Sequence, residues 1–323
     1  MGAALVRCSR RMIVPTFRAK QWGTVPWAKP VSDEAVGFVR RSRRRRGMIV
    51  QTLWIAEPAA SINQKRQNVK AMQIDVAIIG GTGVGSRLAE LPGQSLFLPT
   101  AGGPLRGRVI KFGGSQVLAI QRHAAGHAKP PHKVAYAAFT LGLKALGIKH
   151  CLSTAAVGSL RTDWPIGTIV ACTDFIDASG RNLTLFDSKV QHTPMDHPFT
   201  AAPASSLRQA LIQAGIEAPE KAVYLQANGP RYETSAEILA FAREGADIVG
   251  MTAASEATLM REAGIRYECL AVVTNLAAGL GTEIDHGAVG DVMKDNASPI
   301  FKILDSAVGH LTAQCGQKPS RKL

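Results

Sequence analysis

The feature that most constrains this chain is a regular alternation of short apolar runs and amphipathic segments, which begins at Ile74. The first run, Asp75 to Ile79, leads into Gly80-Gly81-Thr82-Gly83, a pattern typical of a buried strand that enters a tight loop. Later apolar runs are separated by segments with helical spacing, most of which stop at a glycine. This alternation predicts an α/β fold, in which one domain has a central mixed β-sheet flanked by helices.

The expected elements follow from the same periodicity. Apolar runs predict strands at 75–79, 109–112, 116–120, 151–156, 168–175, 222–226, 248–251 and 267–274. Helical spacing predicts helices at 133–146, 204–214, 235–244, 256–263 and 287–311. The strands on either side of Gly113-Gly114 are expected to pair as a hairpin.

The N-terminal segment has a different character. Residues 1–72 carry 15 Lys and Arg against 3 Asp and Glu, whereas residues 73–323 carry 23 against 21. The net charge of +14 therefore belongs almost entirely to this segment, and its run of arginines at 40–46 is typical of a solvated tail. We predict a basic, disordered extension over residues 1–72, a globular domain over 73–315 and a basic tail over 316–323.

Three interpretations of the extension stay open. It is Arg-rich and poor in acidic residues, as a transit peptide is. Alternatively, translation begins at Met48 or Met72, and the upstream residues come from a mis-assigned gene start. Nucleic-acid binding through the Arg-rich run is the third interpretation, which a nearly neutral globular part disfavours. No apolar stretch approaches the roughly 18 residues of a membrane span, so we expect no membrane association.

Cysteine and histidine usage bears on compartment and on metals. The five cysteines are scattered without a CxxC pair, which indicates neither a disulfide framework nor a zinc site and favours a cytoplasmic protein. His127 and His132 lie close together, but no carboxylate or cysteine accompanies them at ligand spacing. We therefore expect no metal.

Polar residues follow several of the predicted strands. Ligands of open α/β sheets collect beyond the carboxyl ends of strands, and an Arg fork with a neighbouring His donor suits a phosphate there. A tight turn, a surface basic pair or ordinary core packing would explain any one of these residues alone. Their coincidence favours a common site, whose members are Thr82, Arg122, His123, Thr154, Ala155 and Thr252.

Seven sequence runs, taken together, identify a family resemblance. They are IIGGTG (78–83), RH (122–123), STAAVGSL (153–160), GPRYET (229–234), GADIVGMT (245–252), EAGI (262–265) and VTNLAAG (273–279). In these runs the chain resembles the trimeric-type purine nucleoside phosphorylases and methylthioadenosine phosphorylases. The resemblance implies cleavage of a nucleoside by inorganic phosphate, giving a free purine and a pentose 1-phosphate. It also implies that no cofactor is used and that a homotrimer, or a dimer of trimers, closes each sugar site with a neighbouring subunit.

The resemblance assigns roles to individual residues. It implies that the six residues of the common site bind phosphate, that Met251 packs against the ribose and that Tyr232 lies against the base. Electrostatic donors fixed near the departing purine would stabilise its developing negative charge. We expect Asn275 and His123 to be the catalytic residues.

Two residues bear on which purine is bound. Methylthioadenosine phosphorylases that resemble this chain carry Asp at the positions of Asn275 and Ala277. An Asn amide can accept a hydrogen bond from N7–H and donate one to a 6-carbonyl, and the Glu233 carboxylate can accept one from N1–H. Adenine has no proton at N1, so the pair would reject it. We predict a 6-oxopurine nucleoside phosphorylase of purine salvage, which acts on inosine and guanosine.

His286 bears on the other end of the nucleoside. By resemblance it falls where purine nucleoside phosphorylases have a His near the 5′-hydroxyl, which favours inosine and guanosine. A solvated His at a helix start is the alternative interpretation. Methylthioinosine or methylthioadenosine therefore stays the alternative substrate.

Overall fold

A computed structural model describes residues 74–201, 203–281 and 284–316 of the chain, and for His286, Cys315 and Gly316 it describes the backbone alone. The expectations for residues 1–72, and for all of the C-terminal tail but the backbone of its first residue, lie outside this description.

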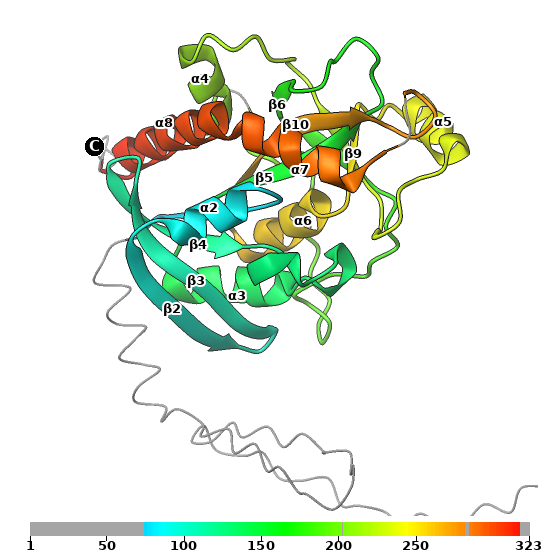
Figure 1. Ribbon diagram of the computed structural model, residues 1–323. Coiled ribbons are helices and arrows are strands. Elements are labelled where there is room, and N and C mark those ends of the chain that lie inside the picture. The colour runs from blue at the N-terminus through cyan, green and yellow to red at the C-terminus, as the bar shows by residue number, and fades with distance from the viewer. Residues whose placement is uncertain (1–73, 202, 282–283, 317–323) are drawn as a thin grey trace, which may run out of the picture. The chain divides into compact units, whose positions relative to one another are not determined.

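In the described residues, ten strands form one mixed sheet, which confirms the predicted fold class (Figure 1). They are β1 (Val76–Gly80), β2 (Gly93–Thr100), β3 (Gly103–Phe112), β4 (Ser115–Gln121), β5 (His150–Ser159), β6 (Ile169–Ala171), β7 (Asp174–Asp177), β8 (Val223–Gln226), β9 (Ile248–Gly250) and β10 (Arg266–Leu276). The order is β2-β3-β4-β1-β5-β9-β8-β7, and β10 pairs with β5 and β6 outside this path. The expected hairpin is present, because β3 and β4 pair antiparallel across Gly113-Gly114.

Strand β5 lies at the centre of the sheet, and in the described residues part of one of its edges has no partner strand, which leaves a gap there. Strand β10 runs parallel to β5 along its whole length. On the opposite edge, β1 pairs in parallel with residues 150–153, and β9 pairs antiparallel with Gly158 and Ser159. Among the described strands, none pairs with residues 154–157 on that edge. This is a topological switch point, where neighbouring strands leave in different directions and a crevice opens.

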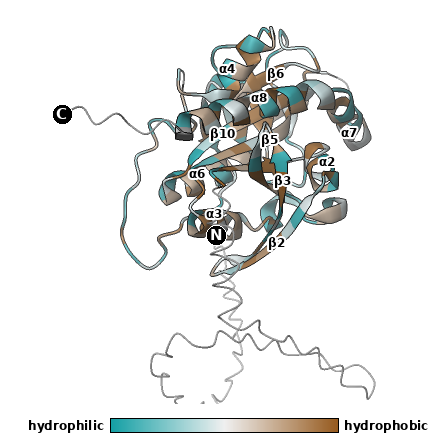
Figure 2. Ribbon diagram, turned by 90° about the vertical axis from the view of Figure 1, so that its left-hand side faces the viewer, coloured by the Kyte–Doolittle hydropathy of each residue, from teal (hydrophilic) through white to brown (hydrophobic). Residues whose placement is uncertain are grey.

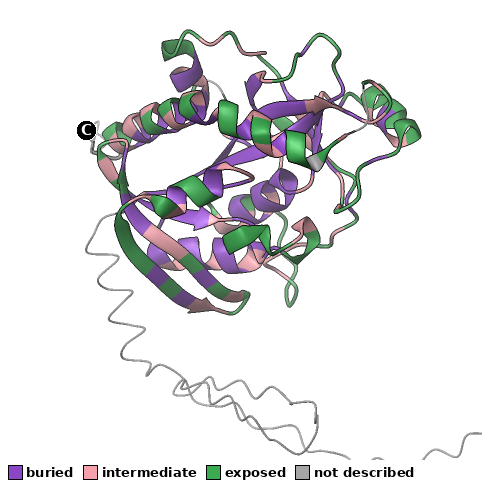
Figure 3. Ribbon diagram, in the orientation of Figure 1, coloured by how far each residue is buried: buried purple, intermediate pink, exposed green. Residues whose placement is uncertain are grey.

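Helices cover both faces of the sheet. They are α2 (Val84–Glu90), α3 (Tyr136–Leu146), α4 (Ser206–Gln213), α5 (Ser235–Arg243), α6 (Ala253–Ala263), α7 (His286–Asp295) and α8 (Ala297–Gly316), with short 3-10 turns at Ala125–His127 and Pro131–Lys133. Helices α3 and α6 pack with one apolar cluster, whereas α2, α4 and α8 pack with a second (Figure 1). Figure 2 shows mixed hydropathy on the helices, and Figure 3 shows that the strands between them are mostly buried.

Two predicted elements are each divided in the structure. The predicted strand 168–175 is two strands, because the chain changes partner: Cys172 N donates to Cys269 O in β10, and Thr173 N donates to Ala222 O beside β8. The predicted helix 287–311 is two helices that meet at Asn296. Pro299, which lacks an N–H and is disfavoured inside a helix, is tolerated in the first turn of α8.

Other boundaries differ less. Helix α6 begins three residues before its predicted start, and β10 extends past Thr274 to Leu276, so that it includes Asn275. Strand β2 was not predicted; its sequence contains glycine and proline, which are depleted in strands.

A buried carboxylate joins helix α4 to strand β10. Glu268 is 4% exposed and accepts hydrogen bonds from the Ser205 and Ser206 hydroxyls (2.8 and 3.1 Å) and from the Ser206 and Leu207 amides (3.1 and 2.9 Å). These amides belong to the first turn of the helix, where N–H groups lack intrahelical partners. Burial raises the pKa of Glu268 in spite of these donors, which each lower it.

Replacing this carboxylate tests the anchor. We expect Glu268→Ala to lower the free energy of unfolding by about 2–4 kcal/mol, because the buried donors lose their acceptor and a small cavity remains. Urea denaturation followed by circular dichroism measures the change. Glu220→Ala, at an exposed position near the same helix, is the control and should stay within about 0.5 kcal/mol of the unmodified protein. Equal stabilities of the two variants would contradict the assignment.

Candidate active site

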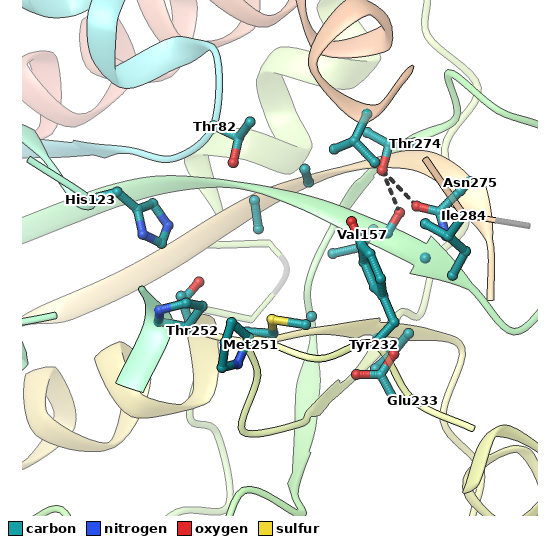
Figure 4. A pocket seen from close by; sticks show the side chains of 18 of the residues that line it. Thr82, His123, Val157, Tyr232, Glu233, Met251, Thr252, Thr274, Asn275 and Ile284 are labelled. Atoms are coloured by element: carbon teal, nitrogen blue, oxygen red, sulfur yellow. Dashed lines mark hydrogen bonds between the residues drawn. The ribbon is translucent and has the colours of Figure 1, made fainter. Parts of the chain in front are cut away.

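A pocket of about 470 Å³ lies at the gap beside β5, where residues 155–158 form part of its wall. Its lining comes from the ends of several strands and from the loops that follow them. In Figure 4, Thr82, His123 and Thr252 gather at one end, and Tyr232, Glu233 and Asn275 gather at the other, with Met251 between them. The pocket therefore has two chemically distinct ends.

The first end is built where strands give way to helices. Thr82 follows β1, Arg122 and His123 follow β4, and Thr252 joins β9 to α6. The buried Tyr224 hydroxyl accepts hydrogen bonds from the amides of Thr252 (3.1 Å) and Ala253 (3.4 Å), which fixes the start of α6. The Thr252 side chain is thus presented to the pocket from a fixed helix start, and Thr82 from the turn between β1 and α2.

At this end of the pocket, Arg122 forms an ion pair with a buried carboxylate. Its side chain is 1% exposed, and its Nε and Nη2 donate to the two carboxylate oxygens of Glu256 in α6 at 2.6 and 2.8 Å. Its Nη1 donates to the Thr154 carbonyl at 2.7 Å. A guanidinium has five N–H donors, so two stay available after these three bonds. The planar fork expected to grip a phosphate is occupied by Glu256.

The Arg122–Glu256 pair belongs to a larger buried network. Tyr267 in β10 donates from its hydroxyl to Glu256 Oε2 (2.7 Å), and the same hydroxyl lies 2.6 Å from Ser153 Oγ. Burial lowers the pKa of Arg122, but the charge and hydrogen bonds of Glu256 raise it by more, so the guanidinium stays charged. The network joins β4, β5, α6 and β10 at the floor of the pocket.

His123 has a defined protonation state. Its Nδ1 lies 2.8 Å from the Lys129 carbonyl, which can only accept, so Nδ1 carries the proton. Burial, reinforced by the charge of Arg122, lowers the pKa of His123 to about 4. The ring is therefore neutral at pH 7, and Nε2 is a hydrogen-bond acceptor, whereas the sequence had suggested a second donor for phosphate.

The second end of the pocket holds a buried carboxylate. Glu233 is 8% exposed, and its Oε1 has no hydrogen-bond partner among the residues that the structure describes. Burial, the largest influence, raises the pKa of Glu233 above its ordinary value. A buried oxygen without a donor is costly unless a ligand supplies one.

Asn275 lies across this end, at a bulge of β10. Its Oδ1 is 3.0 Å from the Thr274 hydroxyl, and its Nδ2 donates to the Leu276 carbonyl at 2.8 Å. One lone pair of Oδ1 and one proton of Nδ2 stay available to a ligand. A Cβ on Gly158 would lie 3.1 Å from Nδ2, so glycine at that position leaves room for the amide.

Every predicted site residue whose side chain is described, except Thr154, lines the pocket, Ala155 and Ala277 included. Thr154 is fully buried behind the wall, where its hydroxyl accepts a hydrogen bond from Gly81 N (3.0 Å). The side chain of His286 lies outside the described residues, although the backbone of His286 begins α7.

Sequence reasoning missed several members of the site. The lining also contains His127, Pro130, Pro131, Ile284 and Val289. Glu256 is the most important omission, since it orients Arg122. A signal for it existed: Glu256 lies between Ala253 and Met260 on the apolar face of its helix, where an unpaired charge would be costly.

The described ranges hold neither a candidate metal site nor a membrane-spanning helix. Residues 74–316, apart from the gaps at 202 and 282–283, contain no group of three or more His, Cys, Asp or Glu that could hold a metal ion. In the same ranges, no helix is long and apolar enough to cross a membrane.

Known proteins of three kinds resemble this chain. A probable S-methyl-5′-thioinosine phosphorylase of Methanopyrus kandleri is 40% identical over 212 residues, covering 64% of this chain and 80% of its own length. The 6-oxopurine nucleoside phosphorylase of Pyrococcus furiosus is 33% identical over 263 residues, covering 76% and 97%. The crystal structure of methylthioadenosine phosphorylase from Schistosoma mansoni with adenine has a TM-score of 0.70 at 29% identity, covering 75% of this chain and 93% of that one.

The sequence model of the phosphorylase superfamily matches residues 75–309, which include every lining residue of the pocket. The match extends across both ends of the site and across the buried network beneath it. The chain belongs to the phosphorylase superfamily.

Proposed function

We propose that this protein cleaves 6-oxopurine nucleosides, inosine and guanosine, with inorganic phosphate, and that it releases the free base and ribose 1-phosphate. One observation carries the proposal: among the described residues, none donates to the buried Oε1 of Glu233, at the end of the pocket that also holds the Asn275 amide. A 6-oxopurine supplies the missing donor from N1–H, while its 6-carbonyl and N7 meet the amide. Adenine would leave both the carboxylate and the amide donor unpaired.

The reaction then follows from the two ends of the pocket. Phosphate at the end near Thr82, His123 and Thr252 attacks C1′ of the ribose, forming a C1′–O bond as the C1′–N9 bond breaks. The purine leaves with both electrons of that bond, and Asn275 stabilises the developing negative charge by donating from Nδ2 to the 6-carbonyl. N7 then takes a proton from water, and Asn275 Oδ1 accepts a hydrogen bond from the resulting N7–H. Neutral His123 accepts a hydrogen bond from a protonated phosphate oxygen through Nε2. None of these steps uses a metal or an organic cofactor.

Methylthioinosine is a second candidate substrate. The side chains of Met251, Ile284 and Val289 give the pocket apolar surface, which suits a thioether better than a hydroxyl. The relative from Methanopyrus kandleri is named for this substrate. Phosphate-dependent release of hypoxanthine from inosine and from 5′-methylthioinosine decides between them, because the higher kcat/KM identifies the 5′ substituent that the pocket accepts.

We also infer a cytoplasmic enzyme that assembles as a homotrimer or as a dimer of trimers. Cys151, Cys172 and Cys269 are free and buried, which is common in reducing compartments. The assembly is inferred from the family resemblance alone, and sedimentation equilibrium tests it.

Asn275→Asp tests the recognition of the 6-carbonyl. The aspartate loses the amide donor and gains a charge, so we expect kcat/KM for inosine to fall by about a hundredfold, the usual cost of one lost donor at a transition state. Some turnover of adenosine should appear, because a carboxylate accepts from a 6-amino group. Asn296→Asp, at the junction of α7 and α8, is the matched control. An unchanged ratio of inosine to adenosine turnover would refute the role of Asn275.

Glu233→Gln tests the acceptor for N1–H through its pH dependence. The carboxylate form is lost as the pH falls through the raised pKa of Glu233, so kcat/KM for inosine should decline at a pH above the ordinary carboxyl range. In the variant an uncharged amide replaces the charged acceptor for N1–H, so kcat/KM for inosine at pH 7 should be about 10- to 100-fold lower. The amide does not titrate, so the pH profile of the variant should lack this acid limb. Glu220→Gln is the control. An identical acid limb in Glu233→Gln would assign the titration to another group.

A further inference from the structure

Arg181 contacts the pocket from behind, although it is not part of the lining. It lies in the loop after β7, and its Nε donates to Asn228 Oδ1 at 2.8 Å while Nη2 donates to the Asn228 carbonyl. Its Nη1 donates to the Met251 carbonyl at 3.0 Å and lies 3.2 Å from both the Ser255 and Tyr136 hydroxyls. One guanidinium therefore reaches four separate parts of the fold.

These partners hold the walls of the part of the pocket in which we place the nucleoside, here called the nucleoside half. Asn228 immediately precedes the run 229–233, which ends in Glu233, and Met251 lines the centre of the pocket. Tyr136 donates its hydroxyl proton to the carbonyl of Pro131, another lining residue, at 2.8 Å. Three walls of the site are thus connected through a single side chain.

The loop that carries Arg181 is itself fixed to the core. The fully buried Gln226 accepts a hydrogen bond from Ser255 N (2.9 Å), and its Nε2 donates to Ser255 Oγ (2.8 Å) and to Ser179 Oγ (3.2 Å). Ser179 is two residues before Arg181, so its bond to Gln226 fixes the backbone from which the Arg181 side chain extends. Within the described residues Arg181 has no ion-pair partner, and its bonds go to carbonyl, amide and hydroxyl oxygens.

We propose that Arg181 is a positioning residue, which sets the distance between the Asn228–Glu233 segment and Met251 that a purine nucleoside requires. The inference rests on the proposed function, because it assigns the base and the ribose to these two walls. The planar guanidinium spreads its donors over three nitrogens and so spans acceptors on two segments, whereas a lysine ammonium has its three donors on a single nitrogen. None of the direct partners of Arg181 is Thr82, His123 or Thr252, so its replacement should affect nucleoside binding more than phosphate binding.

Steady-state kinetics of Arg181→Lys separates positioning from general stability. We expect kcat/KM for inosine to fall by about a hundredfold, the loss that a misplacement of ~1 Å can produce. The KM for phosphate should change by less than about twofold, because the phosphate end keeps its contacts. Equal changes in the KM values for phosphate and nucleoside would overturn the proposal, and so would unchanged kinetics.

Arg208→Lys is the matched control. Arg208 in α4 also donates to a backbone carbonyl, that of Pro219, at 2.7 Å, but neither residue lines the pocket. Asn228→Ala is a milder second variant, which removes one acceptor of Arg181 and keeps the guanidinium. We expect the two changes at Arg181 and Asn228 to be non-additive in kcat/KM, and strictly additive effects would count against their coupling.

Hydrogen exchange provides a measurement that does not depend on turnover. In Arg181→Lys the amides of residues 227–234 should exchange faster, whereas those of 116–123 should be unchanged. Unchanged exchange at 227–234 would overturn the positioning role even if turnover fell. If the unmodified protein turned over no nucleoside, the proposed function would fail, and the exchange experiment would still decide whether Arg181 holds this segment.

Discussion

The buried ion pair between Arg122 and Glu256 is the interaction on which the rest of the site depends. Both side chains are 1% exposed, so removing either partner would leave an uncompensated charge in the core, a change that costs about 3–5 kcal/mol. The pair also carries structural information. Arg122 comes from the end of β4 and Glu256 from the first turn of α6, and Tyr267 and Thr154 add β10 and β5 to the same network. The gap beside β5 is therefore framed by elements that cannot move independently.

This pairing determines the electrostatics of the end of the pocket where we place phosphate. Because Glu256 neutralises Arg122, and because His123 is neutral, this end offers hydroxyls, two guanidinium N–H groups and one imidazole acceptor instead of a strong positive field. An anion bound there would be held mainly by directed hydrogen bonds, whose strength grows where water is excluded. Such a site selects an anion by the geometry of its hydrogen bonds. Because its net positive charge is small, it attracts unrelated polyanions less strongly.

Sequence reasoning recovered what depends on local pattern and missed what depends on partners. Apolar runs and glycines located most strands, and residues at their ends, such as Thr82 and Asn275, do meet in one pocket. Nothing local indicated that the chain changes partner at Cys172, which divides one predicted strand into two. Likewise, the role of Glu256 is defined by Arg122, which is 134 residues away in the sequence. The role of Arg181 is defined in part by Asn228, which is 47 residues away. The spacing of a single sequence can mark a charge on an apolar face, as at Glu256, but it does not indicate which distant side chain pairs with that charge.

The two ends of the pocket differ in how freely they can change. The first end is built from strand termini and a helix start that share the buried network, so substitutions there affect the core. The second end is built from the segment 228–233, which Arg181 bonds at Asn228, and from the bulge of β10, which pairs with β5. In a family built this way, changes at the second end can alter which base and which 5′ substituent are bound. The first end, where we place phosphate, can stay the same. Relatives named for 6-oxopurine nucleosides, methylthioinosine and methylthioadenosine, at 29–40% identity, are what such a division would produce.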